Sequence, residues 1–194
     1  ILGLFMSDNV KIIGVSRGTV VRYMKQFKMP TKNLSEACRK YPRKPFSEND
    51  VEKAYMLGFR TGDIYVRRNH HTIVPTLGST HPATIKLFQR IYGKYGHCDQ
   101  GPQRCDFGYK WNLRCYLDKS FSFLLEKPSK VPTDNRLFYS FLAGYADAEG
   151  CWSIRKGRHW ISVAFILITE DLRILKEIKR TLEKDNYHPS FRLV

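Results

Sequence analysis

Two acidic residues, Asp63 and Glu149, occupy matching places in two similar segments of the chain, 86 residues apart. Each acid ends an apolar stretch that carries a pair of small residues four positions apart, namely Gly58 and Gly62 in the first stretch and Gly144 and Ala148 in the second. Residues four apart lie on one face of an α-helix, and small residues on facing helices let two backbones approach closely. Two such helices packed side by side in parallel would bring Asp63 and Glu149 together.

The paired acids would repel each other unless a cation bound between them. A helix C-terminus already carries partial negative charge, so a carboxylate is poorly placed there. Mg²⁺ prefers carboxylate, carbonyl and water oxygens as ligands, and a metal that bridges water and phosphate oxygens is a common means of hydrolysing a phosphodiester. An acid that follows a single helix is often only solvated, but the repetition at matched positions favours a metal-binding pair.

The elements around the two acids also recur, which predicts two repeats, 47–127 and 128–194. Ser47–Asp50 is typical of a capping box before the first helix, and Thr133–Asp134 marks the start of the second. Each helix is followed by two strands and a further helix, predicted at 64–74 and 80–95 in the first repeat and at 152–167 and 171–187 in the second. Residues 107–117 alternate as a half-buried strand with Lys110, Asn112 and Arg114 on one face, and 120–126 form a short helix. The second repeat is expected to be incomplete at its C-terminal end.

Residues 1–30 predict a helix-turn-helix module, truncated at its start, and residues 31–46 predict a basic linker. A short first segment at 9–13 precedes a helix that Ser16 can cap and that Pro30 ends. The candidate DNA-binding residues of this helix are Arg17, Thr19, Arg22, Tyr23 and Lys25. A plain two-helix hairpin with solvated charges is the alternative.

The charge of the chain favours a polyanionic partner. Thirty-three Lys and Arg residues oppose eighteen Asp and Glu residues, for a net charge of +15, and nucleic acid is the usual partner of such a chain. The sequence has no apolar stretch long enough for a membrane span. Five scattered cysteines without a CxxC motif indicate neither a zinc module nor a disulfide framework. A reduced intracellular compartment is expected, either the cytoplasm or nucleoid of a prokaryote or an organelle.

The segment 141–150, FLAGYADAEG, closely resembles the LAGLIDADG motif of homing endonucleases, and 56–63, MLGFRTGD, is similar to a degenerate first copy. The resemblance covers residues 47–194. It implies an α/β (α+β) fold of two pseudo-symmetric αββαββα repeats that form a saddle-shaped antiparallel sheet. It also implies that Asp63 and Glu149 bind divalent metal with the backbone carbonyls of Gly62 and Ala148. Mg²⁺ is the expected cofactor, Mn²⁺ could replace it, and Ca²⁺ could bind without supporting cleavage.

The same resemblance implies a monomer that cuts a long, specific site in double-stranded DNA. The basic and polar strand residues match the saddle by their position in the repeat only, and they are Arg67, Arg68, Lys110, Asn112, Arg114, Arg155, Lys156 and Arg158. Two features depart from the family pattern. Ile64 replaces the final glycine of the first motif, and neither 77–79 nor 168–170 supplies the Lys or Gln expected at the ends of the second strands.

Two rival functions remain open. The first is a non-cleaving relative on the same scaffold, either a maturase that binds intron RNA or a DNA-binding transcription regulator. The second is a recombinase-like helix-turn-helix protein with an unrelated partner domain, which has no use for twin helices that end in acids. The three tryptophans, Trp111, Trp152 and Trp160, are expected to be core or sheet anchors rather than platforms for base stacking.

Overall fold

The computed structural model of the chain describes residues 14–28, 41–106 and 108–190, which belong to two compact units, Ile1–Pro42 and Arg43–Val194. In the first unit the described element is helix α2 (Arg17–Gln26), whose N-cap is Ser16 as expected. The first helix of the expected helix-turn-helix, at 9–13, lies outside the described residues, so the helix-turn-helix stays a prediction. None of the helices in the described ranges has the length and apolar character that a membrane span requires.

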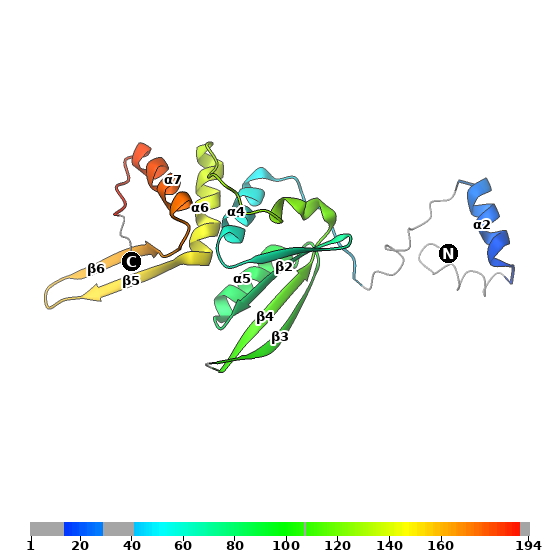
Figure 1. The fold of residues 1–194 in the computed structure, drawn as a ribbon, viewed down its shortest axis with the longest axis horizontal. Coiled ribbons are helices and arrows are strands. Elements are labelled where there is room, and N and C mark those ends of the chain that lie inside the picture. The colour runs from blue at the N-terminus through cyan, green and yellow to red at the C-terminus, as the bar shows by residue number, and fades with distance from the viewer. Residues whose placement is uncertain (1–13, 29–40, 107, 191–194) are drawn as a thin grey trace. The chain divides into compact units, whose positions relative to one another are not determined.

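The second unit begins with a four-stranded antiparallel sheet and the helices around it (Figure 1). The elements of this first repeat are α4 (Asp50–Thr61), β1 (Tyr65–Asn69), β2 (Thr72–Ser79), α5 (Pro82–Tyr92), β3 (His97–Cys105), β4 (Gly108–Tyr116) and the 3-10 helix η1 (Lys119–Leu124). The strands lie in the order β1-β2-β4-β3, and every neighbouring pair is antiparallel.

The second repeat copies the first half of this arrangement. Its described elements are α6 (Asn135–Glu149), β5 (Gly150–Lys156), β6 (Ile161–Leu167) and α7 (Leu172–Lys184). Strands β5 and β6 form an antiparallel hairpin of their own. The mixed helical and antiparallel architecture is as expected, with two separate sheets among the described residues rather than one continuous sheet.

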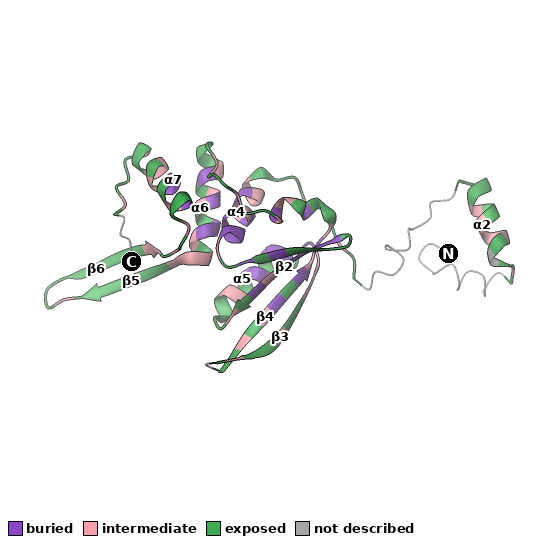
Figure 2. Ribbon diagram, viewed as in Figure 1, coloured by how far each residue is buried: buried purple, intermediate pink, exposed green. Residues whose placement is uncertain are grey.

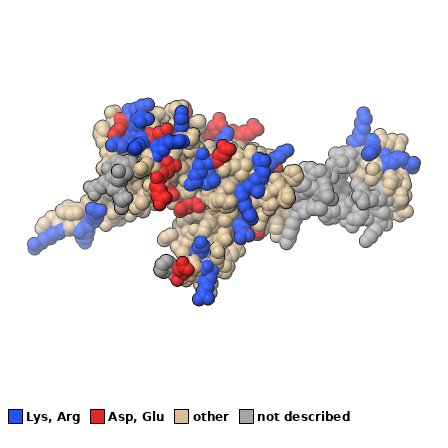
Figure 3. Space-filling view, viewed as in Figure 1, with Lys and Arg blue, Asp and Glu red and all other residues tan. Residues whose placement is uncertain are grey.

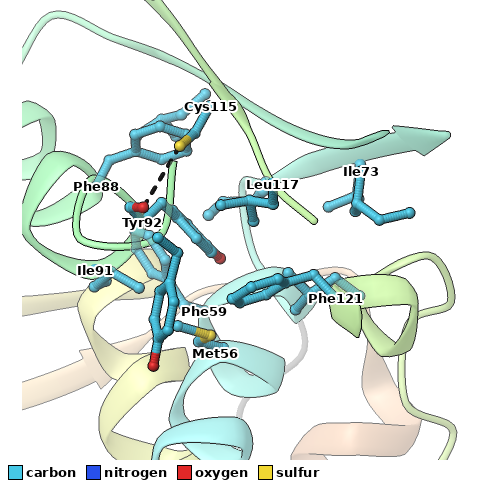
Figure 4. Packing of buried hydrophobic residues seen from close by; sticks show 14 of the residues in the cluster. Met56, Phe59, Ile73, Phe88, Ile91, Tyr92, Cys115, Leu117 and Phe121 are labelled. Carbon is cyan, nitrogen blue, oxygen red and sulfur yellow. Dashed lines mark hydrogen bonds between the residues drawn. The ribbon is translucent and has the colours of Figure 1, made fainter. Parts of the chain in front are cut away.

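The core consists of two apolar clusters that meet at α4. One cluster lies between the four-stranded sheet, α4, α5 and η1, where Met56 and Phe59 of α4 face Phe121 of η1 (Figure 4). In the same cluster the Cys115 thiol donates to the Tyr92 carbonyl oxygen at 3.6 Å. The other cluster joins Ala54 of α4 to the buried aromatic residues of α6 and to the apolar face of α7. Helix α4 therefore contributes to both clusters, which ties the two repeats together.

The N-cap residue predicted for the helix of the second repeat is correct, and the one predicted for the helix of the first repeat is wrong. Asp134 caps α6 by accepting a hydrogen bond from the Leu137 amide, as predicted. The cap of α4 is Asn49 rather than Ser47, because the Asn49 side chain accepts from the amides of Val51 and Glu52. The Ser47 hydroxyl instead donates to the carboxylate of Glu52.

The expected core position of the tryptophans is wrong, because the three residues are between 42% and 71% exposed. Trp111 and Trp152 do lie in sheet strands, β4 and β5. One face of the β5–β6 hairpin carries Trp152, Ile154, Val163 and Phe165, and all four are exposed (Figure 2). The corresponding face of β1 and β2 in the first repeat is buried in the cluster that includes residues of α4, α5 and η1. No comparable strand pair follows α7 in the residues that the structure describes.

Candidate functional site

Helices α4 and α6 lie side by side, and their glycines set the distance between them (Figure 1). A Cβ atom added at Gly58 would overlap the carbonyl oxygen of Phe141 and would lie 2.8 Å from its carbonyl carbon. A Cβ atom added at Gly144 would overlap the carbonyl oxygen of Tyr55 in the same way. Ser140 adds a hydrogen bond of 2.6 Å to the Val51 carbonyl oxygen across the interface. The close approach predicted from the small residues is confirmed.

The C-terminal ends of the two helices converge at Gly62. A Cβ atom added at Gly62 would overlap the Ala148 side chain and would lie 3.1 Å from Oε1 of Glu149. The Glu149 carboxylate is thus held against the residue that precedes Asp63. Glu149 therefore lies beside the residue next to Asp63, and the charge of Asp63 acts on its carboxylate.

The electrostatics of the site agree with this geometry. Burial raises the pKa of Glu149 above its ordinary value, the charge of Asp63 raises it further, and the charge of Lys127 opposes both effects. Asp63 is exposed and Glu149 is partly buried. The ionised pair is therefore held at an energetic cost, which a bound cation would relieve.

The oxygen ligands at these helix ends fit a hard divalent cation. Among the described residues no group of three or more His, Cys, Asp or Glu side chains could hold a metal ion. The two carboxylates would therefore be supplemented by the carbonyl oxygens of Gly62 and Ala148 and by water, a ligand set that Mg²⁺ accepts and that Zn²⁺ or Cu²⁺ does not favour. The absence of a Cβ atom at Gly62 lets Ala148 and Glu149 approach this helix end closely.

Lys127 also belongs to this site, and the sequence analysis did not find it. Its Nζ atom donates to the carbonyl oxygen of Thr61 at 2.8 Å and to that of Gly62 at 3.4 Å. Basic residues are expected only at the ends of the second strands, whereas Lys127 lies in the observed segment 125–134 that joins η1 to α6, here called the linker between the repeats. The only signal in the sequence is a lysine in a linker that must pass the end of α4, which is weak evidence by itself.

Arg60 is a second residue that the sequence analysis missed. It is only 8% exposed, and its Nε atom donates to the Leu124 carbonyl oxygen at 3.0 Å. Its Nη1 atom donates to the Ile64 carbonyl oxygen at 2.5 Å. Arg60 therefore ties the end of η1 to the chain just beyond Asp63.

The predicted DNA-contacting residues of the first sheet divide between its two faces. Side chains alternate along a strand, so Arg67 lies on the face opposite the buried Val66, and Arg68 lies on the same face as Val66. Arg68 lines a cavity of about 480 Å³ together with Ile73 and residues of η1.

Strand β4 places its predicted residues on one face. Lys110, Asn112 and Arg114 alternate with buried Leu113 and Cys115, and Arg114 lies opposite Thr76 of β2. Because Thr76 also pairs with Tyr65, this face is the one that carries Arg67. The face away from α5 and η1, here called the open face, thus presents Arg67, Lys110, Asn112 and Arg114.

The β5–β6 hairpin divides its basic residues in the same way. Arg155 lies on the polar face with Ser153, while Lys156 lies on the apolar face with Trp152 and Ile154. Arg158 is exposed in the turn between the strands. Lys and Arg side chains are visible at the far end of this hairpin and at the far ends of β3 and β4 (Figure 3).

Four of the five predicted residues of α2 have described side chains, and that of Arg17 lies outside the described set. Thr19 is engaged at the start of the helix, where its amide donates to Ser16 Oγ. The Arg22 guanidinium lies 5.7 Å from the centre of the Tyr23 ring. Arg22, Tyr23 and Lys25 are exposed and therefore accessible to a ligand.

No family model matches the chain, and no curated protein matches it. Several solved structures are similar, and two of them are described here. One is I-DmoI in complex with DNA and Mn, with a TM-score of 0.47 and 15% identity over 75% of this chain and 83% of that chain. The other is the homing endonuclease I-WcaI bound to its DNA recognition sequence, with a TM-score of 0.42 and 12% identity over 75% of this chain and 89% of that chain.

The similarity is remote in sequence, and the case for function comes from the residues of this chain. Those residues are the acids at the converging helix ends, the cations around them and the basic open face of the sheet.

Proposed function

We propose that this chain is a site-specific DNA endonuclease of the LAGLIDADG homing type. In this proposal it hydrolyses both strands of a duplex with a divalent cation held by Asp63 and Glu149. The observation that carries the proposal is the placement of Glu149 Oε1 beside Gly62, at the end of the helix that leads into Asp63. A fold that needed only to bind DNA would gain nothing from placing two acids at the ends of two glycine-packed helices.

In the proposed mechanism the protein positions the reacting groups. The cation, when bound, would polarise the phosphodiester and lower the pKa of a water molecule. Asp63 and Glu149 would hold it with the carbonyl oxygens of Gly62 and Ala148. The packing of Gly58 against Phe141 holds the two helix ends in register, so the ligands need little reorganisation when the cation binds.

The proposed partner is double-stranded DNA with a long recognition site, bound by one chain whose two repeats act as an internal pseudo-dimer. The open face would carry base and phosphate contacts, and the net charge of +15 would draw the protein to a polyanion. The polar face of the β5–β6 hairpin would extend the contact along the duplex. Helix α2 would add further contacts through Arg22, Tyr23 and Lys25. A non-cleaving protein that binds intron RNA is the alternative.

A cleavage screen tests the proposed function. The protein is incubated with a library of randomised duplexes in Mg²⁺, Mn²⁺, Ca²⁺ or EDTA, and the ends produced are sequenced. The proposal expects double-strand breaks at one recurrent sequence in Mg²⁺ or Mn²⁺ and none in Ca²⁺ or EDTA. Sequence-specific retention of the duplex without breaks in any metal would instead identify a DNA-binding regulator, and preferential retention of structured RNA would identify a maturase.

The division of the arginines between the sheet faces leads to a prediction about binding. The variant R67A is expected to lower the affinity for duplex DNA and to reduce the slope of log affinity against log salt by about one, because one phosphate contact is lost. The neighbouring variant R68A removes the same charge from the opposite face and should leave the slope unchanged. Fluorescence anisotropy between about 50 and 200 mM salt measures both slopes. Equal effects of the two variants would rule out the open face as the DNA-binding surface.

A further inference from the structure

The linker between the repeats places one ammonium group at the end of α4. Lys127 Nζ contacts the carbonyl oxygens of Thr61 and Gly62, at 2.8 and 3.4 Å. These are among the last carbonyl groups of the helix, where the negative end of the helix dipole lies. The same charge attracts the Glu149 carboxylate. Lys127 therefore offsets both sources of negative charge at the site.

The position of Lys127 is supported by buried contacts. Arg60 is almost fully buried and binds the Leu124 carbonyl oxygen, which is three residues before Lys127 in the chain. Leu124 itself is fully buried, and Pro128 follows Lys127 and restricts the backbone there. The chain thus enters the linker from a fixed point close to the end of α4. The core therefore anchors the backbone close to Lys127, whose side chain is exposed and bonds to the end of α4.

We infer that Lys127 is a built-in counter-cation, which neutralises the converging helix ends in the metal-free protein and competes with divalent metal for the Gly62 carbonyl. This inference rests on the proposed metal site at Asp63 and Glu149. A divalent ion bound by both acids would lie within a few ångströms of the Lys127 ammonium, and two positive charges at that range repel each other. Lys127 is a positioning residue, since it acts on the ligands and not on the substrate. Its presence sets the metal concentration at which the site fills.

A metal-binding measurement on the protein without DNA tests this inference. Mn²⁺ binding is followed by the electron paramagnetic resonance signal of the free ion in the wild type and in K127M, K127R and K130M. The K127M variant is expected to bind Mn²⁺ about tenfold more tightly, because a repelling charge has been removed. It should also melt at a lower temperature than the wild type in EDTA, and this deficit should shrink when Mn²⁺ is added.

Two control variants separate charge from other effects. The K127R variant keeps the positive charge and should bind Mn²⁺ with an affinity within about threefold of the wild type. Lys130 is exposed in the same linker, so K130M removes an equal charge and should change the affinity by less than about twofold. A purely structural role for Lys127 would weaken metal binding in K127M, so the direction of the change is decisive.

The possible failures can be told apart. If K127M binds Mn²⁺ no more tightly than the wild type, while the double variant D63N/E149Q loses binding, the metal site stands and the counter-cation inference is overturned. If D63N/E149Q binds Mn²⁺ as the wild type does, the metal lies elsewhere, and both the inference and the proposed function fail. If K127R binds as tightly as K127M, the charge of residue 127 is irrelevant and the inference is again wrong.

Discussion

The variants D63N and E149Q are expected to cut duplex DNA at least about a thousandfold more slowly than the wild type while they bind it with similar affinity. Each substitution replaces an anionic metal ligand with a neutral amide of nearly the same size. The cation that activates water and stabilises the developing charge would then be held too weakly to act. DNA affinity should stay the same or rise slightly, because a negative charge near the phosphates has been removed. Single-turnover cleavage and anisotropy titrations in Ca²⁺ measure the two quantities separately.

The stability of E149Q provides the control for this experiment. Burial, followed by the charge of Asp63, raises the pKa of Glu149 in the folded chain. The stabilising contribution of this group is therefore complete below the pKa of the unfolded chain and is lost as pH rises through the raised folded pKa.

At neutral pH in EDTA the ionised Glu149 destabilises the fold, so E149Q should melt at the same temperature as the wild type or about 1–2 °C higher. The effect is small because solvent screens a partly exposed group. The difference should disappear in acid, where Glu149 is protonated. If E149Q is as stable as the wild type but does not cleave DNA, the loss of cleavage is due to the missing metal ligand and not to unfolding. Undiminished cleavage by both variants would refute the assignment of the site.

The variant G58A is expected to destabilise the protein by about 3 kcal/mol, a fall in melting temperature of roughly 6–12 °C. Its new methyl group would overlap the Phe141 carbonyl oxygen and would lie 2.8 and 2.9 Å from the Phe141 carbonyl carbon and the Tyr145 nitrogen. Because these are backbone atoms of α6, no side-chain rotation relieves the clash. The helices must separate, and this cost exceeds the gain of about 1 kcal/mol in helix propensity from replacing glycine with alanine.

The matched control for G58A is G101A. Gly101 lies in β3, and a Cβ atom added there meets nothing within 4 Å. This variant should unfold within about 0.5 kcal/mol of the wild type. Separation of α4 from α6 would also move Asp63 away from Glu149, so G58A should lose Mn²⁺ affinity whereas G101A should keep it. Equal melting temperatures for G58A and the wild type would show that the two helices do not pack through Gly58.

Much of the site could be predicted from the sequence because its parts obey rules of local spacing. The small residues four apart define a face of each helix whatever the rest of the chain does. Gly58 and Gly144 are separated by the same number of residues as Asp63 and Glu149. Parallel helices that pack through these glycines therefore end with the two acids side by side. The strand pattern at 107–117 likewise predicted a shared face for Lys110, Asn112 and Arg114, since alternation is a property of the strand itself.

The helix cap and the exposure of the tryptophans were predicted less well, because both depend on which other residues contact these side chains in the folded chain. Ser47 and Asn49 are both good helix caps in sequence, and Asn49 is the cap because Ser47 is held by Glu52 and Tyr95. The tryptophans were expected by residue type to be core or sheet anchors. Their exposure depends on what covers the β5–β6 hairpin, and a residue type does not encode that.

By itself, the sequence determined the two acid-ended helices, their shared small-residue face and the positive charge of the chain. The tertiary structure alone decided which cationic side chains lie near the acids and which arginine side chains lie on the same face of the sheet. Lys127 reaches Gly62 across 65 residues of chain, and Arg60 reaches Leu124 across 64. Such contacts carry no periodic signal, because they arise where separately specified elements pack and bring distant residues within hydrogen-bonding distance. A periodic sequence pattern reports only which residues of one element share a face. Which residues of different elements attract each other depends on how the elements pack.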